Sequence, residues 1–421
     1  MRIATWIALV LALAASPSMA KPAAQPAGLK LERVVLLMRH GIRPPTKATV
    51  TPPGIASQPW PAWDAPWGHL TAHGAKAVIE LARYDRAVWA GRDLLPARGC
   101  PEAGQMEIWA DSDQRTIATG EAMSEGLFPG CNLTAGHFEQ GKLDPLFSPL
   151  DHPGSLDAEA AKAAIRTEGG DPERILKAHR AEVDLMQRVL GCCAAPACAE
   201  AGLSADCRLH DMPSAIVMPK DDGRPEATGP MDFLPTAAQS LMLAYVEGKP
   251  LAEVGWGRTS KRDIERMMVL HALKGRLLQR PAYIAARGAT PLAWRMLEAM
   301  SPGPAAARVT VLVGHDTNIV HLGGMLGLHW RVAGYPADNP PPAGGIGFEV
   351  LQDAKGARFV RAFYRSQTMD QMRFLTRLDA AHPAYRQVVA IPGCTALGVD
   401  GLCTLAQFSS LVKSRMREGA S

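Results

Sequence analysis

The chain has 421 residues, of which 47% are hydrophobic and 20% are charged. This composition is typical of a globular protein, and the length allows one large domain or two small ones. A formal net charge of +4 is too mild to indicate nucleic acid as a partner, and we expect none, so any affinity for anions must come from local clusters of basic residues.

The N-terminus matches the pattern of a secretory signal peptide. Arg2 is followed by an apolar run from Ile3 to Ala15 and then by a short, mostly small-residue segment that ends at Ala20. The alternative is an N-terminal membrane anchor, but this run is too short to span a bilayer comfortably. We therefore predict cleavage near Ala20, a periplasmic or secreted location, and no membrane association after cleavage.

Three apolar segments predict strands of one sheet. Val34–Met38 and Val309–Val313 are continuous and β-branched, which is typical of parallel strands that are buried on both faces. Met106–Ala110 is a weaker third segment. Ligands of open α/β sheets bind beyond the carboxyl ends of the strands. We therefore expect the polar residues that follow these strands to converge on one crevice: Arg39-His40, Asp111–Arg115 and His315-Asp316.

Helical patterns lie between these strands. Thr71 is a suitable N-cap for a helix from about Gly74 to Trp89. The segment Arg174–Leu190 carries its apolar residues on one stripe and predicts an amphipathic helix, and Asp263 is predicted to open another. The histidines on these two stripes are interpreted as packed or partly exposed residues outside the chemistry: His179 and His271.

The domain organisation follows from where the strand signals lie. Residues 155–280 contain mainly helix and loop signals, and long insertions are tolerated because the entropy of loop closure grows slowly with length. We predict an α/β fold with a mostly parallel central sheet flanked by helices, formed by residues 21–154 and 281–421. A signal peptide at 1–20 precedes it, and a mainly helical cap domain at 155–280 is inserted into it.

The most informative stretch is RHGIRPPT, residues 39–46. His40 lies at a predicted strand end between Arg39 and Arg43, and a glycine follows it. A guanidinium group donates paired hydrogen bonds to phosphate and stays charged. Gly41 allows the backbone to turn and to approach a ligand closely. Five fixed positions in the string R-H-G-x-R-x-P predict a phosphate site rather than a structural histidine.

On these residues the sequence resembles the histidine acid phosphatase family, branch 2 of the histidine phosphatase superfamily, and within it the bacterial periplasmic phytases and glucose-1-phosphatases. The resemblance covers nearly the whole mature chain and implies a phosphoglycerate-mutase-like core with an inserted helical cap. It rests on matching segments in the same order: Arg39–Lys47, Leu70–Gly74, Asp111–Glu121, Asp144–Phe147, Gly255–Gly257, Gly314–Asn318 and Pro341–Glu349.

The resemblance also implies a role for each site residue. His40 would be the nucleophile that forms a phosphohistidine intermediate, and Asp316 would protonate the leaving oxygen. Four residues would hold the phosphoryl oxygens: Arg39, Arg43, Arg115 and His315. Four others match positions that bind phosphate or substrate: Thr46, Lys47, Asp111 and Thr317.

The chemistry is consistent with these roles. A phosphate ester leaves poorly as an alkoxide, so a general acid must donate a proton. Nearby arginines lower the pKa of His40 through repulsion and keep the imidazole neutral. They also balance the charge of the transition state, so no metal or other cofactor is needed and we expect none. A metal-dependent hydrolase is the alternative, and loss of activity with EDTA would favour it.

We predict a monomeric acid phosphatase that acts on a small-molecule phosphate monoester, with phytate as the leading substrate. Lys47, after a threonine, favours phytate. The segment Ala237–Gly257 resembles the glucose-1-phosphatases in length. Gln239 stands where those relatives carry an acid that contacts substrate, and its neutral amide favours a polyphosphorylated ligand. The alternatives are therefore a glucose-1-phosphatase or broad sugar phosphatase of the same fold, and a phosphate-binding protein without turnover.

Eight cysteines in an exported chain predict disulfide bonds. A metal site formed by the four cysteines between 192 and 207 with His210 is the alternative, but the spacing fits no zinc pattern well. The pairing of Cys192 and Cys193 stays open. We expect three pairs: Cys100–Cys131, Cys198–Cys207 and Cys394–Cys403.

Overall fold

The computed structural model describes residues 26–192, 208–219, 223–301, 303 and 307–420. The predicted signal peptide and the predicted pair Cys198–Cys207 lie outside these residues. None of the helices among the described residues is long and apolar enough to cross a membrane.

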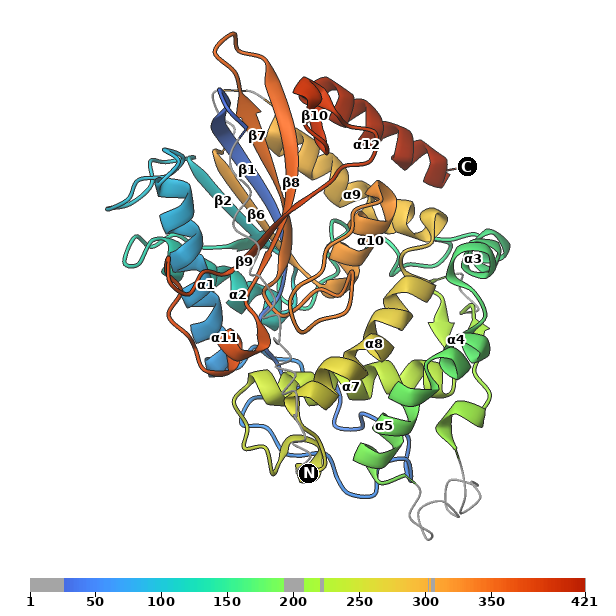
Figure 1. Ribbon diagram of the computed structural model, residues 1–421. Helices are drawn as coiled ribbons and strands as arrows, with labels where there is room; N and C mark the ends of the chain where they lie inside the picture. Colours follow the sequence, from blue (N-terminus) through green and yellow to red (C-terminus); the bar gives the residue numbers. More distant parts are fainter. Residues whose placement is uncertain (1–25, 193–207, 220–222, 302, 304–306, 421) are drawn as a thin grey trace, which may run out of the picture.

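Eight strands form one mixed sheet, in the order β10-β8-β7-β1-β6-β2-β3 with β9 paired to β8 (Figure 1). Strands β1, β6, β2 and β3 are parallel to one another, whereas β7 to β10 pair in antiparallel fashion. The α/β fold class is therefore confirmed. The strand bounds are β1 Lys30–Arg39, β2 Met106–Ala110, β3 Gly136–His137, β6 Val309–Gly314, β7 Gly345–Gln352, β8 Arg358–Ser366, β9 Tyr385–Val389 and β10 Leu402–Thr404.

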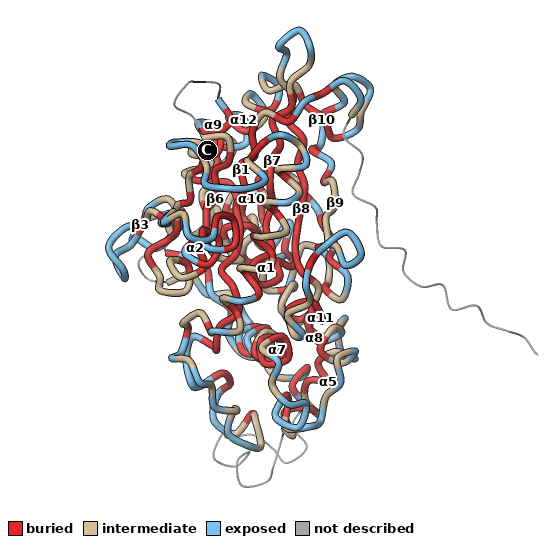
Figure 2. The backbone as a smooth tube through the Cα atoms, turned by 90° about the vertical axis from the view of Figure 1, so that its left-hand side faces the viewer, coloured by how far each residue is buried: buried red, intermediate tan, exposed pale blue. Residues whose placement is uncertain are grey.

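Both faces of the sheet are covered, because alternate side chains of β1 point to opposite sides. Val34 and Leu36 belong to a cluster with α1 and α2, whereas Val35 and Leu37 belong to a cluster with α9, α10 and α12. Figure 2 shows the central strands as buried. The helix bounds are α1 Ala72–Ala90, α2 Gln114–Leu127, α9 Ala282–Met300, α10 Asp316–Leu326, α11 Met369–Arg373 and α12 Leu405–Ala420.

A mainly helical segment lies beyond one end of the sheet in Figure 1. It also contains a two-stranded hairpin, β4 Ile216–Val217 with β5 Glu226–Ala227. The exact borders of the predicted cap at 155 and 280 remain a prediction. The α-helices are α3 Ala158–Ala164, α4 Pro172–Ala178, α5 Arg180–Leu190, α7 Pro230–Val246 and α8 Lys261–Leu278. A π-helical turn at Ile165–Gly169 and 3₁₀ turns at Leu209–Asp211 and Val254–Gly257 lie between them.

One helix prediction is wrong in its continuity. The segment Arg174–Leu190 is not a single helix, because the chain leaves helical geometry at His179, with φ −106° and ψ 29°, between α4 and α5. The apolar stripe nevertheless persists, and Leu176, Val183 and Met186 are buried. A single non-helical residue that keeps the apolar residues on one side does not alter the hydrophobic periodicity, so this break cannot be predicted from the apolar pattern.

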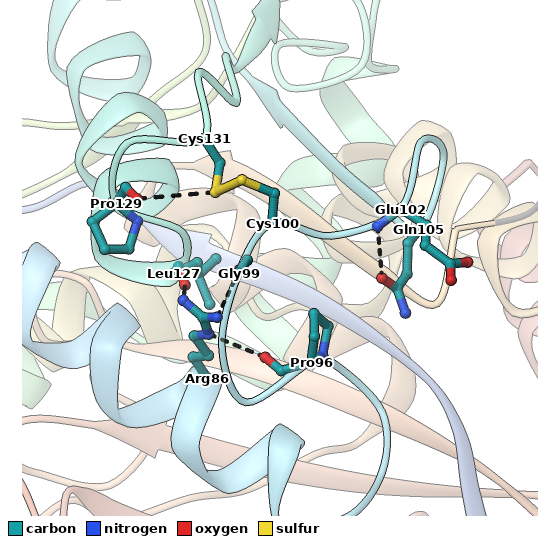
Figure 3. The surroundings of a disulfide bond; sticks show 9 residues. All are labelled: Arg86, Pro96, Gly99, Cys100, Glu102, Gln105, Leu127, Pro129 and Cys131. Carbon is teal, nitrogen blue, oxygen red and sulfur yellow. Dashed lines mark hydrogen bonds between the residues drawn. A yellow bond between two sulfur atoms is a disulfide. The ribbon is translucent and has the colours of Figure 1, made fainter.

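Two of the predicted disulfides are confirmed, Cys100–Cys131 and Cys394–Cys403. The first joins the loop after α1 to the segment after α2, and Figure 3 shows its surroundings. Arg86 of α1 reinforces this junction, since its guanidinium donates to three backbone carbonyls of the two segments: those of Pro96, Gly99 and Leu127.

Candidate active site

The parallel register brings three distant segments to one edge of the sheet. Arg39 ends β1 opposite Gly314 of β6, and Ala110 ends β2 opposite Val313. Backbone hydrogen bonds continue past the strands, because the amide of His40 donates to the carbonyl of Gly314 at 2.9 Å. The rings of His40 and His315 consequently lie 5.6 Å apart between centroids. The expected convergence of these segments is therefore present in the geometry.

His40 is buried, and its surroundings fix its tautomer. Its Nδ1 lies 2.8 Å from the carbonyl oxygen of Gly41, which can only accept, so Nδ1 carries the proton and Nε2 keeps a free lone pair. Burial first, and then the charges of Arg43, Arg115, Arg39 and His315, lower the pKa of His40 well below the usual histidine value. The imidazole is therefore neutral and has an Nε2 lone pair that can act as a nucleophile.

The N-terminus of α1 holds the loop after His40 in place. Thr71 caps this helix by accepting from the amide of Gly74 at 2.8 Å, and its own amide donates to the carbonyl of Ile42 at 3.0 Å. Gly74 must be a glycine in this arrangement, since a Cβ atom there would lie 2.5 Å from that same carbonyl oxygen. The amide of Gly41 donates to the hydroxyl of Thr119 on α2 at 3.0 Å.

Three arginines surround His40. Arg39 donates to the carbonyl of Pro340 at 2.7 Å, and Arg43 to that of Pro44 at 2.8 Å. Burial, and then Arg39 and Arg115, lower the pKa of Arg43 to about 9, which still leaves it charged in acid and neutral solution. The Nε atoms of all three arginines are buried without a hydrogen-bond partner among the described residues. The site therefore concentrates positive charge and offers hydrogen-bond donors suited to an anion.

His315 is held by an acidic pair. Its Nε2 lies 2.6 Å from Oδ2 of Asp111 and 3.6 Å from Oδ2 of Asp113, so Nε2 donates to Asp111. Ligand atoms of these three residues lie within 4.8 Å of one another, the spacing of a metal site. Arg115, however, pairs with Asp113 at 2.5 Å and lies 3.4 Å from Nδ1 of His315. The guanidinium of Arg115 thus already supplies the positive charge beside these carboxylates, and it would repel a metal ion.

Asp316 opens α10, and both of its carboxylate oxygens have donors. Oδ1 accepts from the amide of Thr317 at 2.9 Å, whereas Oδ2 lies 3.1 Å from both Arg39 Nη2 and Gln239 Nε2. Burial opposes ionisation, but the charges of the nearby cationic groups, Arg39 above all, outweigh it and hold the pKa of Asp316 well below its usual range. The carboxyl group is therefore ionised when no other anion competes for Arg39.

Two cavities meet at this site. One, of about 220 Å³, is lined by His40, the three side chains that hold His315, and Thr317. The other, of about 460 Å³, extends under α7 and α8. Arg43 and Asp316 line both. The basic residues that line only the larger cavity are His179, His271, Lys274, Arg276 and Arg280.

The predicted site residues are not all equally placed. Most of them line the smaller cavity, and Arg39 lies directly behind Asp316. Thr46 and Lys47 are exposed on the loop after β1 and line neither cavity. Thr46 still borders the site, because Thr46 and Nη1 of Arg115 both lie within 4 Å of the position that a Cβ atom of Gly68 would take.

Two residues that lie at the site are not among those predicted from the sequence. His271 was interpreted as a packed residue, yet its Nε2 lies 3.9 Å from Oδ2 of Asp316. Asn339 had no signal at all, and its amide lies 2.7 Å from Nδ1 of His271. Periodicity could not single out His271, because it lies on the inner stripe of α8 as core residues do.

Comparisons with known proteins agree with this geometry. A sequence profile of the histidine phosphatase superfamily (branch 2) matches residues 30–180 and 263–365. The phytase AppA of Escherichia coli (strain K12) is 33% identical over 91% of this chain and 91% of its own. A glucose-1-phosphatase of Salmonella typhimurium is 27% identical over 92% of this chain and 93% of its own.

Solved structures show the same similarity over the whole fold. The apo form of Hafnia alvei phytase matches with a TM-score of 0.87 and 33% identity, covering 94% of this chain and 100% of that protein. The complex of the same phytase with myo-inositol hexakis sulphate matches with a TM-score of 0.85 and 32% identity, covering 93% and 98%.

Proposed function

Because the chain belongs to branch 2 of the histidine phosphatase superfamily, we propose that it is an acid phosphatase that hydrolyses phosphate monoesters through a phosphohistidine on His40. One observation carries the proposal above the others. A buried, neutral imidazole with a free Nε2 lone pair lies among three guanidinium groups, and a carboxyl group borders the same cavity.

The reaction proceeds in two displacements. In the first, Nε2 of His40 attacks phosphorus, the N–P bond forms, the P–O bond to the leaving group breaks, and Asp316 gives its proton to the departing oxygen. In the second, water attacks phosphorus and passes a proton to the carboxylate of Asp316, while the N–P bond breaks. Inorganic phosphate leaves, and both side chains return to their starting states.

The proposed activity depends on acid because Asp316 must be protonated before it can donate a proton to the leaving group. In the free site Arg39 is its principal counter-ion and favours the ionised carboxylate. A bound phosphate brings negative charge next to Asp316 and competes for the guanidinium of Arg39, and both effects raise the pKa of the carboxyl group. Lower pH favours the protonated form further, so turnover is expected to be highest in acid.

We further propose that the leaving group is polyanionic, with phytate as the leading substrate. The leaving oxygen must face Asp316, which also borders the larger cavity, so the leaving group extends into that cavity. Its lining includes Lys274, Arg276 and Arg280, which suit additional phosphate groups. The neutral amide of Gln239 adds no repulsion there. The similarity to phytases, one of them solved with myo-inositol hexakis sulphate, supports the same choice.

Glucose 1-phosphate is the second candidate, because a glucose-1-phosphatase is 27% identical over nearly the whole chain. For either substrate we propose the roles inferred from the resemblance, with Thr46, Lys47 and Thr317 at the edge of the substrate. The enzyme is proposed to act as a monomer without a cofactor, in the periplasm or outside the cell. The signal-peptide pattern and two disulfides in the described part of the chain support export.

A substrate panel in acid buffer tests the function. We expect wild type to release phosphate from p-nitrophenyl phosphate, phytate and glucose 1-phosphate, most efficiently from phytate, with or without EDTA. His40→Ala should fold, as judged by circular dichroism, and lose essentially all turnover. His137→Ala, an exposed histidine, is the matched control. Substantial turnover by His40→Ala, or loss of wild-type activity in EDTA, would disprove the mechanism, and a preference for glucose 1-phosphate would favour the second candidate.

A further inference from the structure

Gln239 of α7 contacts three functional side chains at once. Its Oε1 accepts from Nη2 of Arg43 at 3.4 Å, and its Nε2 donates to Oδ2 of Asp316 at 3.1 Å. The same Nε2 lies 2.6 Å from Nε2 of His271 on α8. The guanidinium can only donate and the ionised carboxylate can only accept, so these two contacts fix which way the amide of Gln239 faces.

This orientation also fixes the tautomer of His271. Since Gln239 presents an N–H group, Nε2 of His271 must accept and the ring proton must lie on Nδ1. Nδ1 lies 2.7 Å from Nδ2 of Asn339, while Oδ1 of Asn339 is buried without a partner among the described residues. Amide oxygen and nitrogen are nearly indistinguishable in shape. Turning the amide over pairs Oδ1 with Nδ1–H and gives a continuous hydrogen-bond chain.

The charge state of His271 agrees with this chain. Burial lowers the pKa of His271 to about 4. The carboxylate of Asp316 opposes this shift, and three cations that face the ring add to it: Arg39, Lys274 and Arg43. The ring is thus neutral in weakly acidic solution and can accept at Nε2.

Gln239 matters most when substrate is bound. In the free site Oδ2 of Asp316 has two side-chain partners, the ion pair with Arg39 and the hydrogen bond from Gln239. A bound phosphate competes for the guanidinium of Arg39, so the amide of Gln239 is the side-chain contact that continues to orient the carboxyl group. The amide in turn keeps its position only if His271 accepts its second N–H.

We propose that His271 is a positioning residue for the proton donor, because it holds the amide of Gln239, and through it the carboxyl group of Asp316, in the orientation that delivers a proton to the leaving oxygen. This inference rests on the proposed function, since it presupposes that Asp316 is the proton donor. It gives a role to two cap residues that neither bind the transferred phosphoryl group nor exchange a proton with it.

The test compares two leaving groups. Glycerol 2-phosphate must leave as an alkoxide and needs the proton, whereas p-nitrophenyl phosphate leaves as a stabilised phenolate and needs it little. Asp316→Asn sets the scale, with a loss of about 10²–10⁴-fold in kcat/KM on the alkyl ester and a much smaller loss on the aryl ester. We use kcat/KM because it reports the steps up to release of the leaving group, whereas kcat also contains the hydrolysis of the phosphohistidine that both esters share. We expect Gln239→Leu and His271→Phe each to lower the alkyl-to-aryl ratio of kcat/KM by about tenfold, the effect of one hydrogen bond.

The control is His210→Phe, which removes another buried histidine that bonds a carboxylate, Asp184 at 2.9 Å, away from Asp316. Its ratio should equal that of wild type. The double variant Gln239→Leu/His271→Phe should be no worse than either single variant, since the two residues act in one chain. If His271→Phe fails to fold, Gln239→Leu alone decides the outcome.

The failure of this inference is distinguishable from that of the proposed function. If Gln239→Leu slows both esters alike and leaves the ratio unchanged, the positioning role is disproved while the function stands. If the double variant lost as much as the two single variants together, Gln239 and His271 would act independently, and the proposed hydrogen-bond chain would be disproved. If instead wild type releases no phosphate, or Asp316→Asn leaves the ratio unchanged, the proposed function itself fails.

Discussion

The guanidinium of Arg39 lies 3.1 Å from the carboxylate of Asp316, and its side chain has no exposed surface. Its Nη1 donates to the carbonyl of Pro340 at 2.7 Å. Arg39 is thus both the counter-ion of the proposed acid and a proposed ligand of the phosphoryl group. Binding of the substrate and protonation of Asp316 are coupled through this one side chain.

This coupling predicts the behaviour of Arg39→Met. Loss of one charge-assisted contact to the transition state should lower kcat/KM by about 10²–10³-fold. Because Arg39 lowers the pKa of Asp316, its removal raises that pKa, so the carboxyl group stays protonated to higher pH. The basic limb of the kcat profile should therefore move upward, and pH–rate profiles on glycerol 2-phosphate measure the shift.

Arg33→Met is the control, since it removes a largely buried arginine near the other end of the same strand. Arg33→Met shows how far the loss of a buried guanidinium away from the site affects kcat/KM and the basic limb. An unmoved basic limb in Arg39→Met would contradict the coupling.

The acid limb should depend on His40. Because the pKa of His40 is lowered, the imidazole stays neutral well below the usual histidine value of about 6.5, and kcat/KM should not fall as pH drops through that range. Arg115→Gln removes one of the charges that lower this pKa, so its acid limb should begin at higher pH than that of wild type. Profiles of kcat/KM measure both.

The surface variant Arg83→Gln provides the comparison, since its partner is Glu80 rather than the site. An acid limb in wild type with a midpoint near the ordinary histidine value would show that His40 is not held neutral.

The parallel half of the sheet could be predicted from the sequence because its signal is local. Val34–Met38 and Val309–Val313 are uninterrupted apolar runs, and each lies within an observed strand. The antiparallel half gave no such signal. β7 contains Gly345 and Gly347, and a Cβ atom at Gly347 would lie 2.1 Å from the ring of Phe363. Position 347 must be a glycine because the ring of Phe363 on the neighbouring strand fills the space of its side chain. A glycine weakens the apolar pattern by which a strand is recognised in sequence.

The site residues also divide into those that could be predicted from the sequence and those that could not. The residues next to strand ends were found because the motif and the strand are contiguous in sequence. The contacts of Gln239 with His271 and with Asp316 span 32 and 77 residues, and that of Asn339 with His271 spans 68. These contacts exist only once α7 and α8 pack beside the sheet edge. No local property of the chain encodes them.

The disulfides should differ in their contribution to stability. Cys100–Cys131 closes a separation of 31 residues and Cys394–Cys403 one of 9. The loss of chain entropy in the unfolded state predicts about 4 kcal/mol for the first and about 3 kcal/mol for the second. Urea unfolding of the two double Cys→Ala variants measures the two losses, with the disulfide-bonded wild type as reference. A larger loss from the shorter loop would contradict the entropic account.

Glu349 of β7 should set the acid limit of stability. Its side chain has no exposed surface and pairs with Arg92, Arg361 and Arg386. Burial opposes its ionisation, but these charges lower its pKa from 4.5 to about 2. A lowered carboxyl pKa contributes stability above the unfolded value that is lost as pH falls through the folded value. The network should therefore retain part of its stabilisation between pH 4.5 and about 2, the range in which an ordinary glutamate loses its charge.

Glu349→Gln tests this network. Leaving buried arginines without their shared partner should lower the free energy of unfolding by about 3–5 kcal/mol near neutral pH, and the gap from wild type should narrow by about 3 kcal/mol as pH falls from 4.5 to about 2. Glu32→Gln is the matched control, because its pair with Arg358 is partly exposed and should contribute less than about 1 kcal/mol. Urea titrations at several pH values measure both variants. A gap that is independent of pH would mean that Glu349 stabilises the sheet by shape and not by charge.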